Sequence, residues 1–143
     1  TRSLLIADDT KVNRIMLTRM LSKHFCKAWE VTETAVADEA VTLFEEALAQ
    51  GDPYGLVIMD EIFDSSSSML GSQAIRRIRA LESSAGLQEV RTAIISWTGQ
   101  AGSEFGIIEP AERQRDGPDG IWGKPLPSFT EGSLQRMLHE LLC

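Results

Sequence analysis

The chain has 143 residues, 43% of them hydrophobic, and its 14 basic and 21 acidic side chains give a net charge of −7. This length suits one globular domain over residues 1–143. The negative charge repels nucleic-acid phosphates, and no apolar run reaches the roughly 18 residues that a membrane span requires. We therefore expect a cytoplasmic domain that contacts neither nucleic acid nor membrane.

The only local basic cluster lies in the sequence AIRRIRALE, residues 74–82. Arg76, Arg77 and Arg79 alternate there with apolar residues at a helical period. This pattern favours a solvated helix face over a nucleic-acid site.

Five short apolar runs predict strands, because turn-forming residues bound them and each is too short for an ordinary helix. They occupy residues 3–7, 28–32, 56–59, 92–97 and 120–122. The segments LLIA, LVIM and AIIS are continuously apolar, as is typical of strands that are buried on both faces.

Helical periodicity fills most of the intervals between these strands. The expected apolar faces are Val12, Ile15, Met16 and Met20 in a first helix; Ala37, Ala40, Val41, Phe44 and Leu48 in a second, ended by Gly51 and Pro53; Leu70, Ala74, Ile78 and Leu81 in a third; and Leu134, Met137, Leu138 and Leu141 in a fifth. Glycines and prolines between residues 98 and 120 leave room only for a short fourth helix at 110–116, within irregular backbone.

The alternation of strands and helices predicts an α/β fold, a doubly wound five-stranded parallel sheet with helices on both faces. In such a sheet the carboxyl ends of the strands share one edge, where ligands bind. Asp8 and Asp9 end the first predicted strand, Asp60 the third, Thr98 the fourth and Lys124 the fifth. We expect these side chains to meet.

This set of side chains suits phosphoryl chemistry. Clustered carboxylates repel one another unless a hard cation such as Mg²⁺ binds among them. A lysine and a threonine can donate to a phosphoryl group, and a carboxylate beside them can attack phosphorus. Each residue taken singly has an ordinary explanation, such as a helix start after Asp8 and Asp9 or a surface lysine at 124. The combination carries the interpretation.

These residues resemble the receiver domain of two-component response regulators. The similarity runs from LLIADD through LVIMD, LGSQAIRRIR and AIISWTG to DGIWGKPLP, essentially the whole chain. It implies the flavodoxin-like strand order 2-1-3-4-5. The chain could equally be the receiver segment of a hybrid histidine kinase.

The resemblance also implies roles for the residues at the sheet edge. Asp60 is similar to the phosphoryl acceptor and Asp9 to a direct Mg²⁺ ligand. Asp8 is then the second acidic partner of the metal, and the backbone carbonyl of Ile62 a further ligand. Thr98 is similar to the hydroxyl that moves toward the acyl phosphate, and its implied partner is the lysine at position 124.

Two segments depart from the family pattern. After the acceptor the chain has Phe63 and Asp64 where Met-Pro is common, and then the serines 65–68, in a loop about three residues longer than usual. We expect a flexible polar loop and a looser lid, with serine phosphorylation as the alternative. The aromatic switch position holds Ile121, and packing is the expected role of the next residue, Trp122.

The function implied is that of a signalling receiver and not of a turnover enzyme. It takes a phosphoryl group from a histidine kinase or a histidine phosphotransfer protein and signals through the face of its fourth and fifth helices, to a homodimer or an effector domain. One alternative is a binding module of pseudo-receiver type. Another is a phosphatase of the haloacid dehalogenase kind, which needs an acid where this chain has Ile62.

Overall fold

The computed structural model describes residues 2–24, 29–64, 66–86, 91–99, 105–107, 114–123 and 136. The elements in chain order are β1 (Arg2–Ala7), α1 (Lys11–His24), β2 (Trp29–Thr34), α2 (Ala37–Ala49), β3 (Leu56–Asp60), α3 (Gly71–Ser84), β4 (Ala93–Thr98), β5 (Phe105–Ile107) and β6 (Gly120–Gly123). No helix in this described part of the chain is long and apolar enough to cross a membrane.

One sheet runs through the molecule in the order β2-β1-β3-β4-β6-β5. Its first five members are parallel, which confirms the predicted five-stranded order. The sixth, β5, pairs antiparallel with β6 at the sheet edge and was not predicted. At three residues it is too short to show a strand pattern in the sequence.

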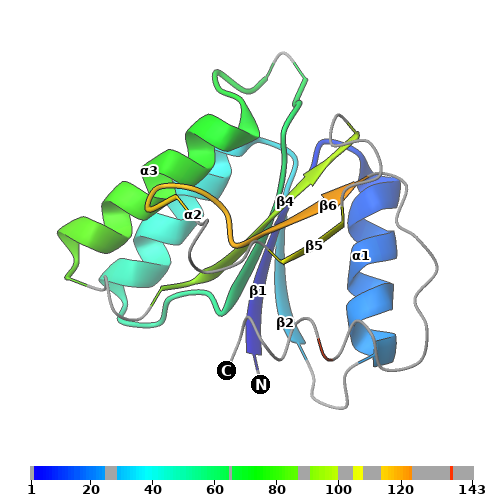
Figure 1. Cartoon of the computed structure of the whole chain (residues 1–143), viewed down its shortest axis with the longest axis horizontal. Helices are drawn as coiled ribbons and strands as arrows, with labels where there is room; N and C mark the ends of the chain where they lie inside the picture. Colours follow the sequence, from blue (N-terminus) through cyan, green and yellow to red (C-terminus); the bar gives the residue numbers. More distant parts are fainter. Residues whose placement is uncertain are drawn as a thin grey trace.

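Helices cover both faces of the sheet, with α1 on one side and α2 and α3 on the other (Figure 1). Each layer has its own apolar core. The α1 side is filled by Leu4, Ile6, Leu17, Leu21, Leu56, Ile58, Ala93, Ile95, Trp97 and Trp122. The opposite side is filled by Leu5, Ala7, Ala37, Ala40, Phe44, Val57, Met59, Ala74, Ile75, Ile78 and Ile94. Successive residues of each central strand point alternately into one core and the other. Both sets of side chains are buried, which explains why these strands are continuously apolar.

The apolar face predicted for the first helix was wrong. Leu17 and Leu21 of α1 are fully buried, whereas Val12 is 71% exposed and Met16 38%. Met20, predicted with the exposed set, packs against the core. Helix α1 carries two apolar stripes, and periodicity alone does not tell which of them faces the sheet.

The region predicted to hold a fourth helix is only partly described. The helix was predicted at 110–116, and the structure describes its last three residues. Residues 114–119 form turns and bends instead of a helix. Gly117 and Pro118 favour such turns over a continued helix. The fifth helix lies outside the described residues, apart from the helical residue 136.

The helix face that was predicted to be solvated contains one buried arginine. Arg76 and Arg77 are exposed, but Arg79 is only 4% exposed. Its guanidinium donates to Glu82 at 2.7 Å and to Asp119 at 2.8 Å. A buried charge needs such partners. Glu82 lies one turn further along the same helix, whereas Asp119 is 40 positions away, which is too far for local periodicity to reveal it.

Candidate functional site

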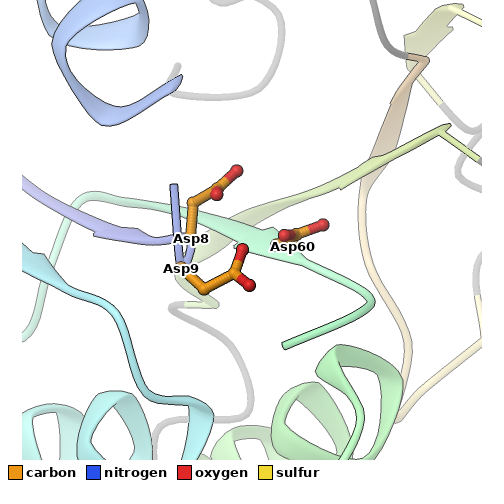
Figure 2. A group of neighbouring side chains, drawn as sticks. All are labelled: Asp8, Asp9 and Asp60. Atoms are coloured by element: carbon orange, nitrogen blue, oxygen red, sulfur yellow. The ribbon is translucent and has the colours of Figure 1, made fainter. Parts of the chain in front are cut away.

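Three carboxylates meet at the carboxyl edge of the parallel strands. Asp8 and Asp9 project from the chain just after β1, and Asp60 projects from the last position of β3 (Figure 2). One oxygen from each lies within 4.8 Å of the others. The strand order that was predicted therefore brings together residues separated by about a third of the chain.

Asp8 is held rigidly by donors from three segments. It is fully buried, and one carboxylate oxygen accepts the backbone N–H of Thr10 at 2.8 Å. The other accepts from Asn13 Nδ2 at 3.2 Å and from Trp97 Nε1 at 2.9 Å. Asp9 is less enclosed, and the bond that it accepts from the Thr10 hydroxyl is long, at 3.4 Å. Asp8 is thus positioned, and Asp9 has more freedom to turn toward a ligand.

Asp60 lies in the middle of the sheet edge. It is 4% exposed, and its Oδ1 accepts the backbone N–H of Glu61 at 2.8 Å. Its register partner on β4 is Trp97, so Thr98 stands one position further along the same edge. A half-buried hydroxyl and a nearly buried carboxylate therefore end adjacent strands.

The start of α3 is fixed against the loop that follows Asp60. The N–H of Gly71 donates to the carbonyl of Glu61 at 2.9 Å. The Glu61 side chain in turn accepts from the hydroxyl of Ser72 at 2.8 Å and from its N–H at 3.3 Å. The contacts of Glu61 satisfy a donor at the N-terminus of the helix, where carboxylates are favourable.

Hydrogen bonds that were not predicted tie the serine loop to α2. Ser67 Oγ accepts the N–H of Ala37 at 3.0 Å, which supplies the first turn of α2 with an acceptor that Val36 lacks. The hydroxyl of Ser68 donates to Asp38, and its N–H does so at 2.8 Å. These bonds lower the pKa of Asp38, first through the Ser68 hydroxyl and then through its N–H.

A second carboxylate folds the same loop on itself. Asp64 accepts the hydroxyl of Ser66 and, at 2.9 Å, its N–H. The hydroxyl and then the N–H lower the pKa of Asp64. The extra length of the loop is therefore used to tie the segment after Asp60 to α2. The aspartate and serines of this loop are typical turn residues, so a turn could be predicted from the sequence. The contact between Ser68 and Asp38 could not, because the two residues are 30 positions apart.

The structure describes some of the remaining predicted site residues and not others. The lysine at position 124 lies outside the described residues. The side chain of Ile62 is 49% exposed, and the role of its carbonyl stays a prediction. Trp122 is fully buried in the core beside Trp97, which supports packing as its role.

The three carboxylates fit a small divalent cation. Oxygens on opposite sides of Mg²⁺, each about 2.0–2.1 Å from the ion, stand about 4.2 Å apart. The observed limit of 4.8 Å is close to that span. One carboxylate can also reach the ion through water, since Mg²⁺ retains several of its waters in proteins. Asp9 and Asp60 suit direct contact, and the tightly bonded Asp8 suits an outer position.

No family model and no curated protein sequence matches the chain. Solved structures do match it. The receiver domain of the histidine kinase CKI1 from Arabidopsis thaliana, complexed with Mg²⁺ and BeF₃⁻, is 26% identical at a TM-score of 0.65, covering 98% of this chain and 89% of that one. The chain therefore has the fold of a receiver domain.

Two further receiver domains agree over almost their full lengths. That of a sensor histidine kinase from Pseudomonas aeruginosa, with a magnesium ion in its active site cleft, has a TM-score of 0.66 at 24% identity, over 99% of this chain and 97% of that one. A CheY-like receiver domain from Methanospirillum hungatei has a TM-score of 0.62 at 19% identity, and the match covers 99% of this chain and 93% of that one. The expected receiver fold is confirmed.

Proposed function

We propose that this receiver domain accepts a phosphoryl group on Asp60. The observation that carries the proposal is the convergence of Asp8, Asp9 and Asp60 within 4.8 Å at the edge of a receiver-type sheet. Two structural neighbours are described with Mg²⁺, one of them together with BeF₃⁻. The same ion suits the acidic cluster here.

The chemistry is a transfer between a partner's phosphohistidine and the Asp60 carboxylate. A carboxylate oxygen of Asp60 attacks phosphorus, the N–P bond breaks, and the imidazole leaves. The N–H of Glu61, 2.8 Å from Oδ1, orients the carboxylate for that attack. Thr98, on the strand beside Asp60, donates to the new phosphoryl group, together with the lysine at position 124. Bound Mg²⁺ supplies positive charge that offsets the negative charge of carboxylates and phosphoryl oxygens.

The phosphodonor is a histidine kinase or a histidine phosphotransfer protein. Helix α1 begins at Lys11, two residues after Asp9, and its exposed face carries Val12, Ile15 and Met16. Large apolar side chains grouped on a surface favour protein contact. A phosphodonor that docks on this face brings its phosphohistidine to the neighbouring carboxylates.

The response to phosphorylation is a shift between two conformations. Thr98 moves toward the acyl phosphate, and the backbone that follows β4 moves with it. The face of the fourth and fifth helices, through which a dimer or an effector domain would bind, lies outside the described residues. Ser67 and Ser68 tie the loop after Asp60 to α2, so α2 also senses the acceptor.

A two-dimensional amide NMR titration tests the proposal. Beryllofluoride, which mimics an aspartyl phosphate, is added to the protein with and without Mg²⁺. We expect shifts at Asp9, Asp60 and Thr98 that require Mg²⁺ and that disappear in Asp60→Asn. Shifts that persist in Asp60→Asn, or a complete lack of response, would assign the acidic cluster another role.

The domain is a signalling receiver and not a turnover phosphatase. A phosphatase of the haloacid dehalogenase kind needs a general acid two residues after its nucleophile, and Ile62 occupies that position. An apolar side chain cannot protonate a leaving group. Sustained hydrolysis of a generic phosphate ester over many turnovers would contradict this view.

A further inference from the structure

Trp97 makes an unusual contact across the sheet. Its indole Nε1 donates to Asp8 Oδ2 at 2.9 Å, although Trp97 is on β4 and Asp8 follows β1. Strand β3 lies between them, so the backbones are separated by two strand spacings, or about 9.6 Å. Only a long side chain with a donor near its tip reaches that far. The indole therefore spans the strand that ends in Asp60.

The contact is well placed to act on the carboxylate. Trp97 is 1% exposed and Asp8 is fully buried, so water competes little for the bond. A buried carboxylate is costly unless donors surround it, and bonds to charged groups are stronger than those between neutral groups. Thr10 and Asn13 come from the segment next to Asp8, whereas Trp97 reaches the carboxylate from another strand. The indole thus fixes Asp8 relative to β4.

We infer that Trp97 is a positioning residue of the metal site, which sets the orientation of Asp8 through its indole N–H. This inference rests on the proposed function, since it assumes that the acidic cluster binds Mg²⁺. Residues that orient metal-binding groups from behind typically contribute about 10- to 100-fold in metal affinity. Trp97 fits that description, because it touches Asp8 and the core but supplies no atom to the ion.

The position of Trp97 in the chain gives the contact a second consequence. Trp97 is the register partner of Asp60 and directly precedes Thr98. A shift of β4 that carries Thr98 toward a phosphoryl group also pulls on the indole, and the indole is bonded to Asp8. Occupancy of the metal site and the position of Thr98 are therefore coupled through one side chain.

The first test measures Mg²⁺ affinity by isothermal titration calorimetry for the wild type and two variants. Trp97→Phe removes the donor and retains an aromatic ring. Trp122→Phe is the matched control, because Trp122 is the register neighbour of Trp97 and is equally buried in the same core cluster. We expect about tenfold weaker binding for Trp97→Phe. Trp122→Phe should stay within about twofold of the wild type.

The outcomes separate this inference from the proposed function. If the wild type itself binds no Mg²⁺, the proposed metal site fails. If the wild type binds and Trp97→Phe binds equally well, the metal site stands and the inference about Trp97 is overturned. Equal losses in both tryptophan variants would also overturn it, since they would show a general packing effect.

A double-mutant cycle asks whether Trp97 acts through Asp8. Asp8→Asn alone should weaken Mg²⁺ binding. Adding Trp97→Phe to the Asp8→Asn variant should then reduce Mg²⁺ affinity much less than Trp97→Phe does in the wild type, because the carboxylate that accepts the indole N–H is already gone. Full additivity of the two losses would contradict a role that acts through Asp8.

A measurement on the unmodified protein covers the case in which Trp97→Phe does not fold. The chain has three tryptophans, so its NMR spectrum holds three indole N–H signals. The Trp97 signal should shift on addition of Mg²⁺ more than those of Trp29 and Trp122. An unchanged Trp97 signal at saturating Mg²⁺ would overturn the inference.

Discussion

Gly71 lies so close to Asp60 that a β-carbon on it would stand 1.7 Å from the Asp60 carbonyl oxygen. No side chain fits in that space, because the obstacle is backbone that cannot rotate away. The glycine lets the N-terminus of α3 pack directly on the end of β3. This contact places the helix at the acceptor and fixes the loop between them.

Gly71→Ala should therefore be strongly destabilising. Overpacking a core position costs about 1–3 kcal/mol and occasionally more. A clash against backbone should lie at the upper end of that range, measured by urea unfolding. Gly55→Ala is the control, since a β-carbon there would meet its nearest neighbour, Ser3 O, at an ordinary 3.5 Å. Equal stability of the two variants would show that the approach of α3 to β3 adjusts easily.

The buried network around Arg79 should contribute strongly to stability. Arg79 donates to Glu82, Asp119 and the carbonyls of Thr92 and Gly117, and so ties α3 to β4 and to the turn before β6. Arg79→Ala leaves two buried carboxylates short of a partner, which costs about 3–5 kcal/mol when a buried pair is broken.

The control for Arg79→Ala lies on the same helix. Arg76 is exposed, and its replacement by alanine should change the free energy of unfolding by no more than about 0.5 kcal/mol. Both variants are compared by chemical denaturation. A loss for Arg79→Ala as small as that for Arg76→Ala would mean that the network is not a significant source of stability.

The link between the serine loop and α2 should weaken in acid. The pKa of Asp38 lies below its ordinary value of 3.8, mainly because the Ser68 hydroxyl and N–H donate to the carboxylate. A pKa that is lower in the folded state gives a stabilisation that is present above pH 3.8 and is lost as the pH falls through the folded-state value.

The amide signal of Ser68 reports this loss directly. It should move as the pH is lowered below 3.8, with a midpoint below that value. In Asp38→Asn the same signal should show no such step. A midpoint at or above 3.8 in the wild type would contradict the hydrogen bonds from Ser68.

Met16→Glu tests the docking face on α1. Met16 is 38% exposed, so the change should leave the fold intact. A charge within an apolar contact should slow phosphotransfer from a phosphohistidine partner by roughly tenfold or more, equivalent to about 1.4 kcal/mol. Phosphorylation by a small donor such as phosphoramidate should be unaffected.

Ala49→Glu, at an exposed position of α2 on the opposite side of the sheet, is the control for docking. It should transfer at the wild-type rate. Equal rates for Met16→Glu and Ala49→Glu would place the phosphodonor elsewhere on the surface.

The sequence was sufficient for the five parallel strands of the sheet and for the three carboxylates that meet at its edge. Continuous apolar runs and their alternation with helices define a parallel sheet, and that topology alone brings Asp8 and Asp60 together. The face of α1 was not predictable, because its two apolar stripes are equivalent until Leu17 meets the sheet. The spacing of apolar residues along a helix does not by itself tell which of two apolar stripes packs against the sheet.

Long-range polar contacts were the other part that the sequence did not reveal. The bonds from Trp97 to Asp8, from Ser68 to Asp38 and from Arg79 to Asp119 each join residues that are 30 or more positions apart. Nothing in the local sequence of either partner specifies the other. Such contacts follow from the topology, so they appear only after the fold is known.

The most direct test of the account is to locate the phosphoryl group. The domain is incubated with phosphoramidate and Mg²⁺, and its intact mass and its peptides are then measured by mass spectrometry. We expect the mass of one phosphoryl group on the peptide that contains Asp60, with none in Asp60→Asn or after removal of Mg²⁺. Phosphoryl incorporation that survives in Asp60→Asn, or that lies on another residue of the wild type, would contradict the assignment.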